Sequence, residues 1–391
     1  MNQELPRYIK KRVLRLLLSP LKLFPVKRNR VFIHNDLGFS FSANPKYVAE
    51  YLIQNYPGII EVVFSVKDPA KYSSLNLPIK FVRFNSFAYF WNAMRSKVFV
   101  SNSGGYAYLP LRKKQFVINT HHGGGCYKTS GLDMFEDTPL FRKDLLLSSN
   151  QTDLFLSTCK RFSDVVSKAI LLDRNKFWEI GMPRNDILIN GDAEKKRLTK
   201  KRIGVEEDEK LVLYAPTYRK PADNYFNESI AISYDIDCEL VCDALRKRFG
   251  GTWRFGFRLH PCVVNRDGLS GNNVIDLSEY PEMQELLLAA DVLINDFSSS
   301  MWDFMLTGKP CFIYAKDLDH YIATTGLYTP VSAWPFPIAR TNEELAKNII
   351  LFDESKYEKD CKRHYDDLGG CETGHATELV CKKIVSLCQQ N

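Results

Sequence analysis

The sequence predicts an α/β protein in which two doubly wound domains face each other across a cleft, with a basic amphipathic helix in front of them. Three observations support this fold class. The chain has 391 residues, more than one hydrophobic core usually holds. Short β-rich runs alternate with helical stretches in both halves, which is typical of parallel sheets covered by helices. The excess positive charge is confined to the start of the chain.

Residues 1–30 carry this charge excess. They contain nine Lys and Arg residues and one acid, whereas the rest of the chain has 44 basic and 45 acidic residues and is nearly neutral. A nucleic-acid-binding protein more often spreads basic residues over its folded surface, so we expect no nucleic-acid partner. Apolar residues make up 45% of the chain, as in folded proteins, and no apolar run is long enough to span a bilayer.

The same segment predicts an amphipathic helix between Pro6, which is acceptable in a first turn, and Pro20, which ends it. An apolar stripe lies opposite basic residues at helical spacing. The stripe consists of Ile9, Val13, Leu16 and Leu17, and the basic residues are Lys10, Lys11 and Arg15. Such a helix can lie in the interface of an anionic membrane, so we expect a peripheral membrane protein. The alternative is a helix docked on the protein's own body.

The body of the chain contains two sets of strand-like runs. The first set lies at 31–35, 61–66, 79–84, 97–101, 115–120 and 153–158, and the second at 211–216, 253–258, 273–277, 291–296 and 310–314. Helices are expected at 44–54, 87–95, 237–248, 282–289 and 300–306. We interpret the charged stretch Lys195–Lys210 as the crossing between domains at 31–200 and 201–391. Ligands of such folds bind at the carboxyl ends of the strands.

The spacing of the cysteines and other potential ligands does not indicate a metal site. Ten cysteines are present without a C-x-x-C spacing, which favours buried thiols in a reducing compartment over a zinc site. No cluster with metal-ligand spacing is visible, so we expect no metal site and no tightly bound cofactor. A loosely held Mg²⁺ on a bound diphosphate is left open.

The run DVLINDFSSSMWDF places three serines directly after an apolar strand that ends at Asp296. A helix that begins there presents free backbone N–H groups and a favourable macrodipole to a phosphate. The position, at a strand-to-helix turn of the second domain, suits a nucleotide diphosphate. The alternative is that Ser298, Ser299 and Ser300 only cap the helix.

Two further strand ends in the second half carry cationic or polar groups. Arg258 and His260 project from one face of a strand end, because side chains two apart in a strand point the same way. The run YAPTYR carries Thr217 and Arg219 just past another strand end. Three strand ends at one rim of the second domain therefore indicate a diphosphate site.

The run HHGGG, at 121–125, follows a predicted strand of the first half. Its glycines let the backbone turn sharply or approach a ligand closely. The G-x-x-x-x-G-K pattern of a phosphate loop is absent, although Lys128 and Thr129 follow. A lone histidine is more often structural, but a glycine-flanked strand end at a cleft favours a catalytic role for one of this pair.

Together these motifs resemble the CDP-glycerol glycerophosphotransferases of teichoic acid and related cell-wall or capsule polymer synthesis. The resemblance follows the family's order over nearly the whole chain. The similar segments are NPKYVAEYL, HHGGGCYKTSG, GMPRNDIL, YAPTYR, RLHP, DVLINDFSSSMWDF and KPCFIYAKDLDHY. The family has a GT-B fold, which agrees with the two facing domains expected above.

The resemblance also implies residue roles. His122 would act as general base on the acceptor hydroxyl, and His260 would hold the donor diphosphate as cytidine monophosphate leaves. The donor-binding residues would be Arg219, Arg258, Ser298, Ser299, Ser300 and Asp303. The acceptor-side residues would be His121, Gly123 and Lys128. The family usually has tryptophan at position 121, so His121 is an alternative base.

We therefore expect a peripheral transferase at the cytoplasmic face of the cell membrane. It would move glycerol phosphate, or a similar alditol phosphate, from a CDP-activated donor to a hydroxyl of a lipid-linked or polymeric glycan and release CMP. One alternative is a GT-B glycosyltransferase that uses a sugar nucleotide, and another is a non-catalytic, membrane-bound glycan-binding protein. The sequence does not distinguish glycerol phosphate from ribitol phosphate as the transferred group, or a primase that adds one unit from a polymerase that adds many. It also does not fix the oligomeric state.

Overall fold

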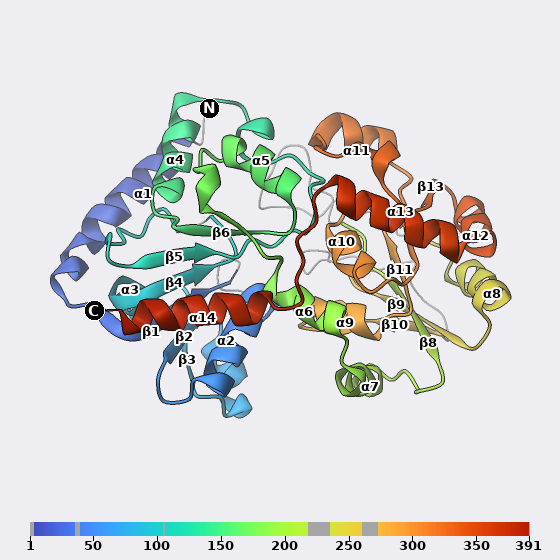
Figure 1. Ribbon diagram of the computed structural model, residues 1–391, viewed down its shortest axis with the longest axis horizontal. Helices are drawn as coiled ribbons and strands as arrows, with labels where there is room; N and C mark the ends of the chain where they lie inside the picture. Colours follow the sequence, from blue (N-terminus) through green and yellow to red (C-terminus); the bar gives the residue numbers. More distant parts are fainter. Residues whose placement is uncertain (1–3, 36–39, 105, 218–234, 260–272, 391) are drawn as a thin grey trace. The chain divides into compact units, whose positions relative to one another are not determined.

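The computed structural model describes residues 4–35, 40–104, 106–217, 235–259 and 273–390. Within these ranges the chain forms two compact units, each with its own parallel sheet (Figure 1). Unit 1 consists of Met1–Asp186 and Leu368–Asn391, and unit 2 consists of Ile187–Asp367. The expected α/β class with two parallel-sheet domains is therefore confirmed.

Unit 1 is built on a seven-stranded sheet. Its strands are β1 (Lys27–His34), β2 (Glu61–Val66), β3 (Ile79–Arg83), β4 (Ser96–Ser101), β5 (Phe116–Asn119), β6 (Leu154–Ser157) and β7 (Phe177–Glu179). All pairs are parallel, in the order β3-β2-β1-β4-β5-β6-β7. The central strands are buried on both faces, as covered parallel strands require.

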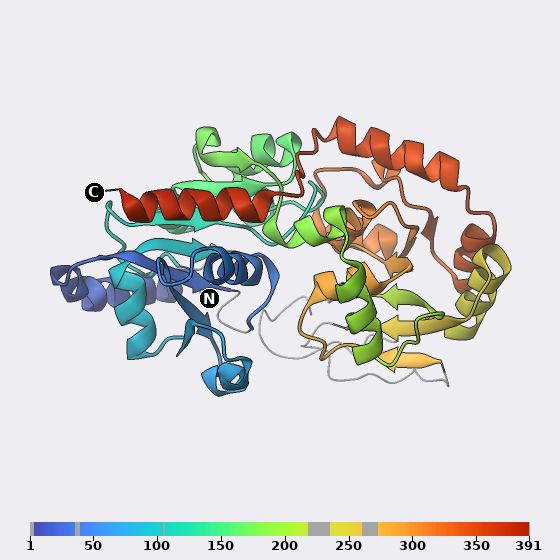
Figure 2. The ribbon, with the colours of Figure 1, turned by 60° about the horizontal axis from the view of Figure 1, so that its bottom comes forward.

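Helices cover both faces of this sheet. They are α1 (Glu4–Leu18), α2 (Ala43–Asn55), α3 (Phe87–Arg95), α4 (Pro139–Ser149), α5 (Lys160–Ala169) and α14 (Ala376–Gln389). On one face, α2 and α14 pack side by side against β1 and β4 (Figure 2). On the other face, α3 and the end of α1 share an apolar cluster with the same strands.

Unit 2 is built on a six-stranded parallel sheet. Its strands are β8 (Lys210–Tyr214), β9 (Trp253–Phe257), β10 (Val274–Asp276), β11 (Val292–Asn295), β12 (Cys311–Tyr314) and β13 (Ile338–Ala339). Their order is β10-β9-β8-β11-β12-β13. Its helices are α7 (Ala193–Arg202), α8 (Cys238–Phe249), α9 (Met283–Ala289), α10 (Ser300–Met305), α11 (Leu318–Thr325), α12 (Asn342–Ile350) and α13 (Glu354–Asp367), and α6 (Asp186–Asn190) begins at the junction of the units.

The predicted strands agree with the observed ones to within four residues at each end, and the predicted body helices correspond to α2, α3, α8, α9 and α10. Agreement is close because buried parallel strands are short, continuous aliphatic runs. The strand order could not be predicted from the sequence. In each parallel sheet, successive strands are first added toward one edge and then, after one change in order, toward the other edge. The change falls between β1 and β4 in unit 1 and between β8 and β11 in unit 2. Open α/β sheets bind ligands at the carboxyl ends of the strands beside such a change.

The limits of the units differ from those expected from the sequence. The chain leaves unit 1 after Asp186 and rejoins it at Leu368, so two connections join the units instead of one crossing within 195–210. The observed units therefore have different limits from the expected domains 31–200 and 201–391.

Packing accounts for this difference. Helix α7, which holds part of the charged stretch, belongs to unit 2, where Lys196 and Lys200 form ion pairs with Asp291. After the chain returns, α14 buries an apolar face against α2 and the sheet of unit 1. The first half of the charged run 195–210 therefore belongs to a packed helix, α7, and is not a linker between the units.

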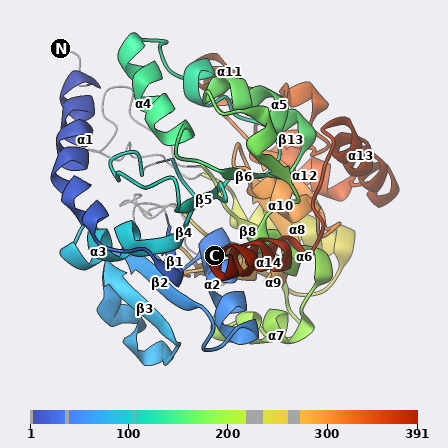
Figure 3. The ribbon, with the colours of Figure 1, turned by 60° about the vertical axis from the view of Figure 1, so that its left-hand side comes forward.

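Helix α1 is observed as predicted, and two of its basic residues bind the body of unit 1. Arg15 Nη1 lies 2.6 Å from the backbone oxygen of Ala107 and 2.7 Å from that of Leu109. Lys11 forms an ion pair with Asp144 of α4, which lies beside α1 (Figure 3). The alternative of a helix docked on the body is therefore observed, and both basic residues and the apolar Leu14 and Leu18 make the contact.

The predicted apolar stripe of α1 stays on the surface. Leu16 and Leu17 have exposed fractions of 73% and 70%, and Ile9 and Val13 of 50% each, whereas Leu18 packs on the core of unit 1. The other described residues therefore leave this stripe at least half exposed. None of the helices within the described ranges is both long and apolar enough to cross a membrane.

The run GMPRND, at 181–186, is held by the returning chain. The backbone N–H of Met182 donates to Glu372 Oε2 at 3.0 Å, and Asn185 Nδ2 donates to Oε1 of the same carboxylate at 2.7 Å. Asp186 accepts hydrogen bonds from the first two backbone N–H groups of α14, at 3.0 and 2.7 Å. The segment 181–186, where the chain leaves unit 1, is therefore hydrogen-bonded to the segment 372–377, where the chain has come back to unit 1.

Gly181 tests how tightly this segment is packed. Its φ is +83°, and an added Cβ would lie 2.2 Å from Glu372 Oε2 and 2.9 Å from Glu372 Cα. Gly58 has a similar φ of +74° with no atom within 4 Å of the added Cβ. We expect both substitutions by alanine to cost about 1 kcal/mol of backbone strain. Gly181→Ala should cost roughly 1–3 kcal/mol more from overpacking, measured by urea unfolding. Equal losses in Gly181→Ala and Gly58→Ala would contradict this packing.

Candidate active site

The carboxyl ends of β1, β4 and β5 bring polar side chains together in unit 1. Asn102, just after β4, donates from Nδ2 to Asn35 Oδ1, just after β1, at 2.6 Å. His122, three residues after β5, places Nδ1 at 2.9 Å from the backbone oxygen of Asn102. Because the strand order changes between β1 and β4, His122 lies beside the position at which open sheets bind ligands.

The bond to Asn102 determines the tautomer that we assign to His122. A carbonyl oxygen can only accept a hydrogen bond, so Nδ1 carries the hydrogen and Nε2 keeps its lone pair. The residue is exposed. An oriented imidazole with a free lone pair at Nε2 is arranged to take a proton from a hydroxyl group.

His121 has a different environment from its neighbour. Its φ of +51° lies in the left-handed region, and its N–H donates to Asn119 Oδ1 at 2.9 Å. Part of the residue is exposed, but its ring packs against Phe155 and Phe162, with centroids 5.5 and 4.9 Å away. Burial, with a smaller effect of nearby positive charge, lowers the pKa of His121 well below 6.5. So weak a base takes up a proton poorly, which favours His122 for that role.

The glycines shape the loop that follows. Gly125 has a φ of +66°, and its N–H donates to Thr158 Oγ1 at 2.9 Å, which closes the loop onto the end of β6. Gly123 and Lys128 are both partly exposed. All three expected acceptor-side residues, His121, Gly123 and Lys128, therefore lie in the loop that carries His122.

Sequence reasoning missed two residues that hold this loop, Asn44 and Arg184. Asn44 Nδ2 donates to the backbone oxygens of Thr120, at 3.0 Å, and His121, at 2.9 Å. Arg184 Nη1 donates to the backbone oxygen of His122 at 2.7 Å. Both residues belong to runs that were noted for their resemblance to a family, NPKYVAEYL and GMPRNDIL, and that resemblance was the signal that could have found them.

In unit 2, Asp296 joins the ends of β8 and β11, the two strands on either side of the change in strand order. Its Oδ1 accepts hydrogen bonds from the backbone N–H and the hydroxyl of Thr217, at 2.8 and 2.7 Å. It also accepts one from the backbone N–H of Phe297. Because Thr217 follows β8 and Asp296 follows β11, this bond joins the two strand ends at which an open sheet binds ligands. The sequence indicated both strand ends but not the bond between them.

The three serines lie directly after this bridge. Ser300 donates from its N–H and its hydroxyl to Ser298 Oγ, at 3.4 and 3.2 Å. Ser299 is the N-cap residue of α10, but its side chain makes no capping hydrogen bond. The hydroxyl of Ser298 therefore caps the start of α10, whereas the hydroxyl of Ser299 does not.

Two expected donor-binding residues make contacts inside unit 2. Asp303 is buried and accepts a hydrogen bond from Gln284 Nε2 at 3.1 Å. The guanidinium of Arg258 lies 3.2 Å from the backbone oxygen of Tyr280 and 3.5 Å from Met283 Sδ, and burial lowers the pKa of Arg258. Asp303 thus fixes α10 to α9, and Arg258 supports the turn before α9.

The remaining expected site residues, Arg219 and His260, lie outside the described residues. Within the described ranges, no group of three or more His, Cys, Asp or Glu side chains could hold a metal ion. The cysteines in those ranges are free thiols and most are buried, as predicted.

Two parallel α/β units with polar strand ends at each change in strand order place the chain in the GT-B-like fold class. The family model of CDP-glycerol:poly(glycerophosphate) glycerophosphotransferase matches residues 18–386. The chain therefore belongs to this family, and the resemblance noted from the motifs is confirmed.

Individual relatives agree with this membership. A teichoic acid poly(glycerol phosphate) polymerase of Staphylococcus epidermidis is 28% identical over 369 residues, which cover 91% of this chain and 50% of the relative. A polymerase of the same description from Bacillus spizizenii is 24% identical over 386 residues, 96% of both chains. This chain thus spans half the length of the first relative. A solved structure of the wall teichoic acid polymerase TagF superposes with a TM-score of 0.83 at 26% identity, covering 99% of this chain and 97% of that one.

One further histidine, His34, lies at the end of β1 in the interior of unit 1. Its ring is fully buried among Phe84, Tyr89 and Phe99, with centroids 5.4, 5.8 and 6.4 Å away. Neither ring nitrogen has a hydrogen-bond partner among the described residues. Burial lowers the pKa of His34 to about 4, so the ring is neutral in the folded protein at neutral pH.

We expect His34 to make the protein less stable in mild acid. A proton binds this imidazole more readily in the unfolded chain, whose pKa is near 6.5, than in the folded one. Stability is therefore lost as the pH falls from about 6.5 toward 4, by roughly 2 kcal/mol between pH 7 and pH 5. His34→Phe should remove this part of the pH dependence, measured by urea unfolding at the two pH values. An unchanged slope in the variant would contradict the assignment.

Proposed function

We propose that the chain transfers glycerol phosphate from a CDP-activated donor to a hydroxyl group of a lipid-linked or polymeric glycan and releases CMP. The observation that carries this proposal is the hydrogen bond from His122 Nδ1 to the backbone oxygen of Asn102, which leaves Nε2 of an exposed imidazole as proton acceptor. Membership of the glycerophosphotransferase family supplies the reaction class. A structure of TagF soaked with CDPG supports the choice of donor.

In this reaction the acceptor hydroxyl gives its proton to His122 Nε2 while its oxygen bonds to the phosphorus of the glycerol phosphate group. The bond between that phosphorus and the oxygen of CMP breaks, and CMP leaves with the electron pair. Phosphoryl transfer depends on alignment and on the dispersal of charge over the phosphate oxygens more than on covalent help from the protein. A well-placed general base contributes roughly 10²–10⁴-fold.

We assign the donor to unit 2 and the acceptor to the loop of His122 in unit 1. The hydroxyl of Ser299 lies beside the bridged strand ends and is not used for capping, so it is our first choice for a phosphate contact. Arg258 and Asp303 act on the donor site by fixing the elements around it. The roles of Arg219 and His260 as donor contacts rest on the family resemblance.

His122→Ala should lower the rate of CMP release from CDP-glycerol by roughly 10²–10⁴-fold, because the proposed general base is removed. His121→Phe should lose less than about tenfold, since the aromatic packing is kept and this histidine is a poor base. His320→Ala, an exposed histidine on α11, is the matched control and should leave the rate unchanged.

The measurement is CMP release with a teichoic acid acceptor, compared with CDP-ribitol and UDP-glucose as donors. Equal rates for wild type and His122→Ala would remove His122 from the role of base. A preference for UDP-glucose would replace the proposed reaction by sugar transfer, and turnover with CDP-ribitol alone would change the alditol.

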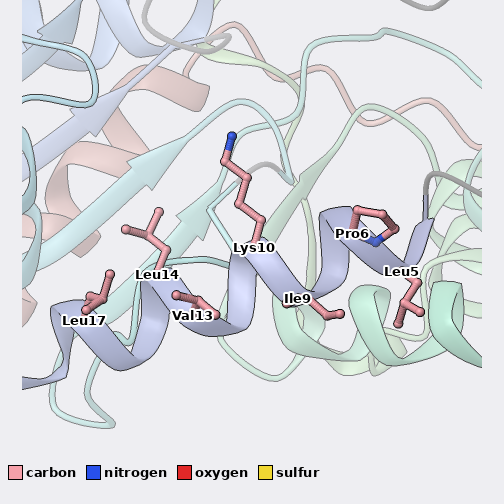
Figure 4. Close-up of a pocket in the computed structure, with 7 residues that line it drawn as sticks. All are labelled: Leu5, Pro6, Ile9, Lys10, Val13, Leu14 and Leu17. Atoms are coloured by element: carbon pink, nitrogen blue, oxygen red, sulfur yellow. The ribbon is translucent and has the colours of Figure 1, made fainter.

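We also propose that α1 places the protein on an anionic membrane, at the cytoplasmic face. The helix presents its apolar side outward, where an open apolar groove of about 630 Å³ runs along it (Figure 4). The groove is lined by Leu5, Pro6, Ile9, Lys10, Val13, Leu14 and Leu17. Because Lys11 and Arg15 are occupied by the body of unit 1, insertion of apolar side chains contributes more to binding than charge attraction does.

Replacing Leu16 and Leu17 by glutamate should therefore release the protein from anionic phospholipid vesicles. Each leucine contributes about 1.5 kcal/mol or more when fully buried, so the partition coefficient should fall by roughly 100-fold. Leu351→Glu is the control, because Leu351 is similarly exposed at 68% but lies in unit 2. Co-sedimentation with vesicles measures the effect. Equal binding of the double variant and the control would refute the membrane assignment.

A further inference from the structure

The loop that carries His122 has little regular structure of its own to hold it. Between the end of β5 and the 3₁₀ turn at Gly131–Asp133 the chain forms neither helix nor named strand. A base in such a loop needs other restraints, because a displacement of about 1 Å at the reacting atoms can cost ~10²-fold in rate. The restraints are visible in the structure as hydrogen bonds to the loop's main chain.

Three consecutive carbonyl groups of this loop accept hydrogen bonds from two side chains. Asn44 Nδ2 donates to the oxygens of Thr120 and His121, and Arg184 Nη1 donates to that of His122. Neither side chain makes a described hydrogen bond with the imidazole of His122, whose Nδ1 faces Asn102. The contacts therefore fix the backbone from which the base projects.

Asn44 and Arg184 also hold each other. The backbone N–H of Arg184 donates to Asn44 Oδ1 at 3.0 Å, so both ends of the Asn44 amide are used. The two residues are 0% and 7% exposed. Buried hydrogen bonds are better defined than exposed ones, and the bond from the Arg184 guanidinium is also charge-assisted, so this pair supports the loop.

The support is itself anchored on its far side. Arg184 lies in the run GMPRND, whose Met182 and Asn185 are bonded to Glu372 of the returning chain. Asn44 lies in the first turn of α2, which packs against α14. The loop of His122 is thus connected, through two side chains, to the returning chain and to the packed helices α2 and α14.

We propose that Asn44 and Arg184 are positioning residues for the base of the transfer reaction and act through the backbone of His122. This inference rests on the proposed function. It predicts that Arg184→Met lowers kcat by roughly 10–10²-fold, because the imidazole is displaced or mobile, while KM for the CDP-activated donor changes less than about twofold.

The variants are chosen to separate positioning from folding. Arg184→Lys keeps a cationic donor and should restore part of the rate lost in Arg184→Met. Asn44→Asp keeps the acceptor for the Arg184 N–H but turns an oxygen toward two carbonyl oxygens, so it should lower kcat as Arg184→Met does. Arg174→Met is the matched control, because Arg174 is also tied into unit 1, to Asp164 and Glu179, and should leave kcat unchanged.

A double-mutant cycle between Arg184→Met and His122→Ala tests the mechanism. If Arg184 acts through the base, Arg184→Met costs less than about twofold once the imidazole is gone. The same loss in both backgrounds would overturn the proposal, as would an unchanged kcat in a folded Arg184→Met or Asn44→Asp protein.

Nitrogen NMR of the His122 ring in the full-length protein supplies a readout that does not need turnover. The wild type should show the tautomer with hydrogen on Nδ1, and Arg184→Met should show an averaged mixture while Arg174→Met does not. An unchanged ring spectrum in Arg184→Met would overturn positioning. Spectra that respond as expected in a protein without CDP-alditol turnover would retain positioning and reject the proposed reaction.

Discussion

The hydrogen bond from His122 Nδ1 to the backbone oxygen of Asn102 is the interaction on which the site in unit 1 depends. It links the loop after β5 to the end of β4, and Asn102 in turn bonds to Asn35 at the end of β1. Because a carbonyl can only accept, the bond assigns the hydrogen to Nδ1 and leaves the lone pair on Nε2. The change in strand order makes the ends of β1 and β4 neighbours, and β5, the next strand, carries the loop of His122.

The same geometry recurs in unit 2 with different chemistry. There the strand ends beside the change in order are joined by Asp296 and Thr217 instead of an imidazole. Oδ1 of Asp296 accepts three hydrogen bonds, from Thr217 and Phe297, and so helps to shape the turn before the serines. Unit 1 therefore presents the exposed imidazole of His122, and unit 2 presents a braced turn with hydroxyl groups.

The strands were predictable because buried parallel strands are continuous aliphatic runs, and the glycines after His122 are what made it a candidate. Asn44 and Arg184 could not be assigned a role, since their bonds join residues 62 to 140 positions apart and leave no local pattern. The domain limits were misplaced for a related reason. Lys196 and Lys200 look like part of a solvated linker in the sequence, but their partner Asp291 lies far along the chain.

Helix α1 shows how far a periodic pattern can be interpreted. The sequence established two faces but not which of them contacts the body. Arg15 docks because the backbone oxygens of Ala107 and Leu109 offer a cation favourable partners, and an apolar face could not have satisfied them. The consequence is an exposed apolar face, which water solvates poorly. This exposed apolar face is the surface that the proposed membrane interface would cover.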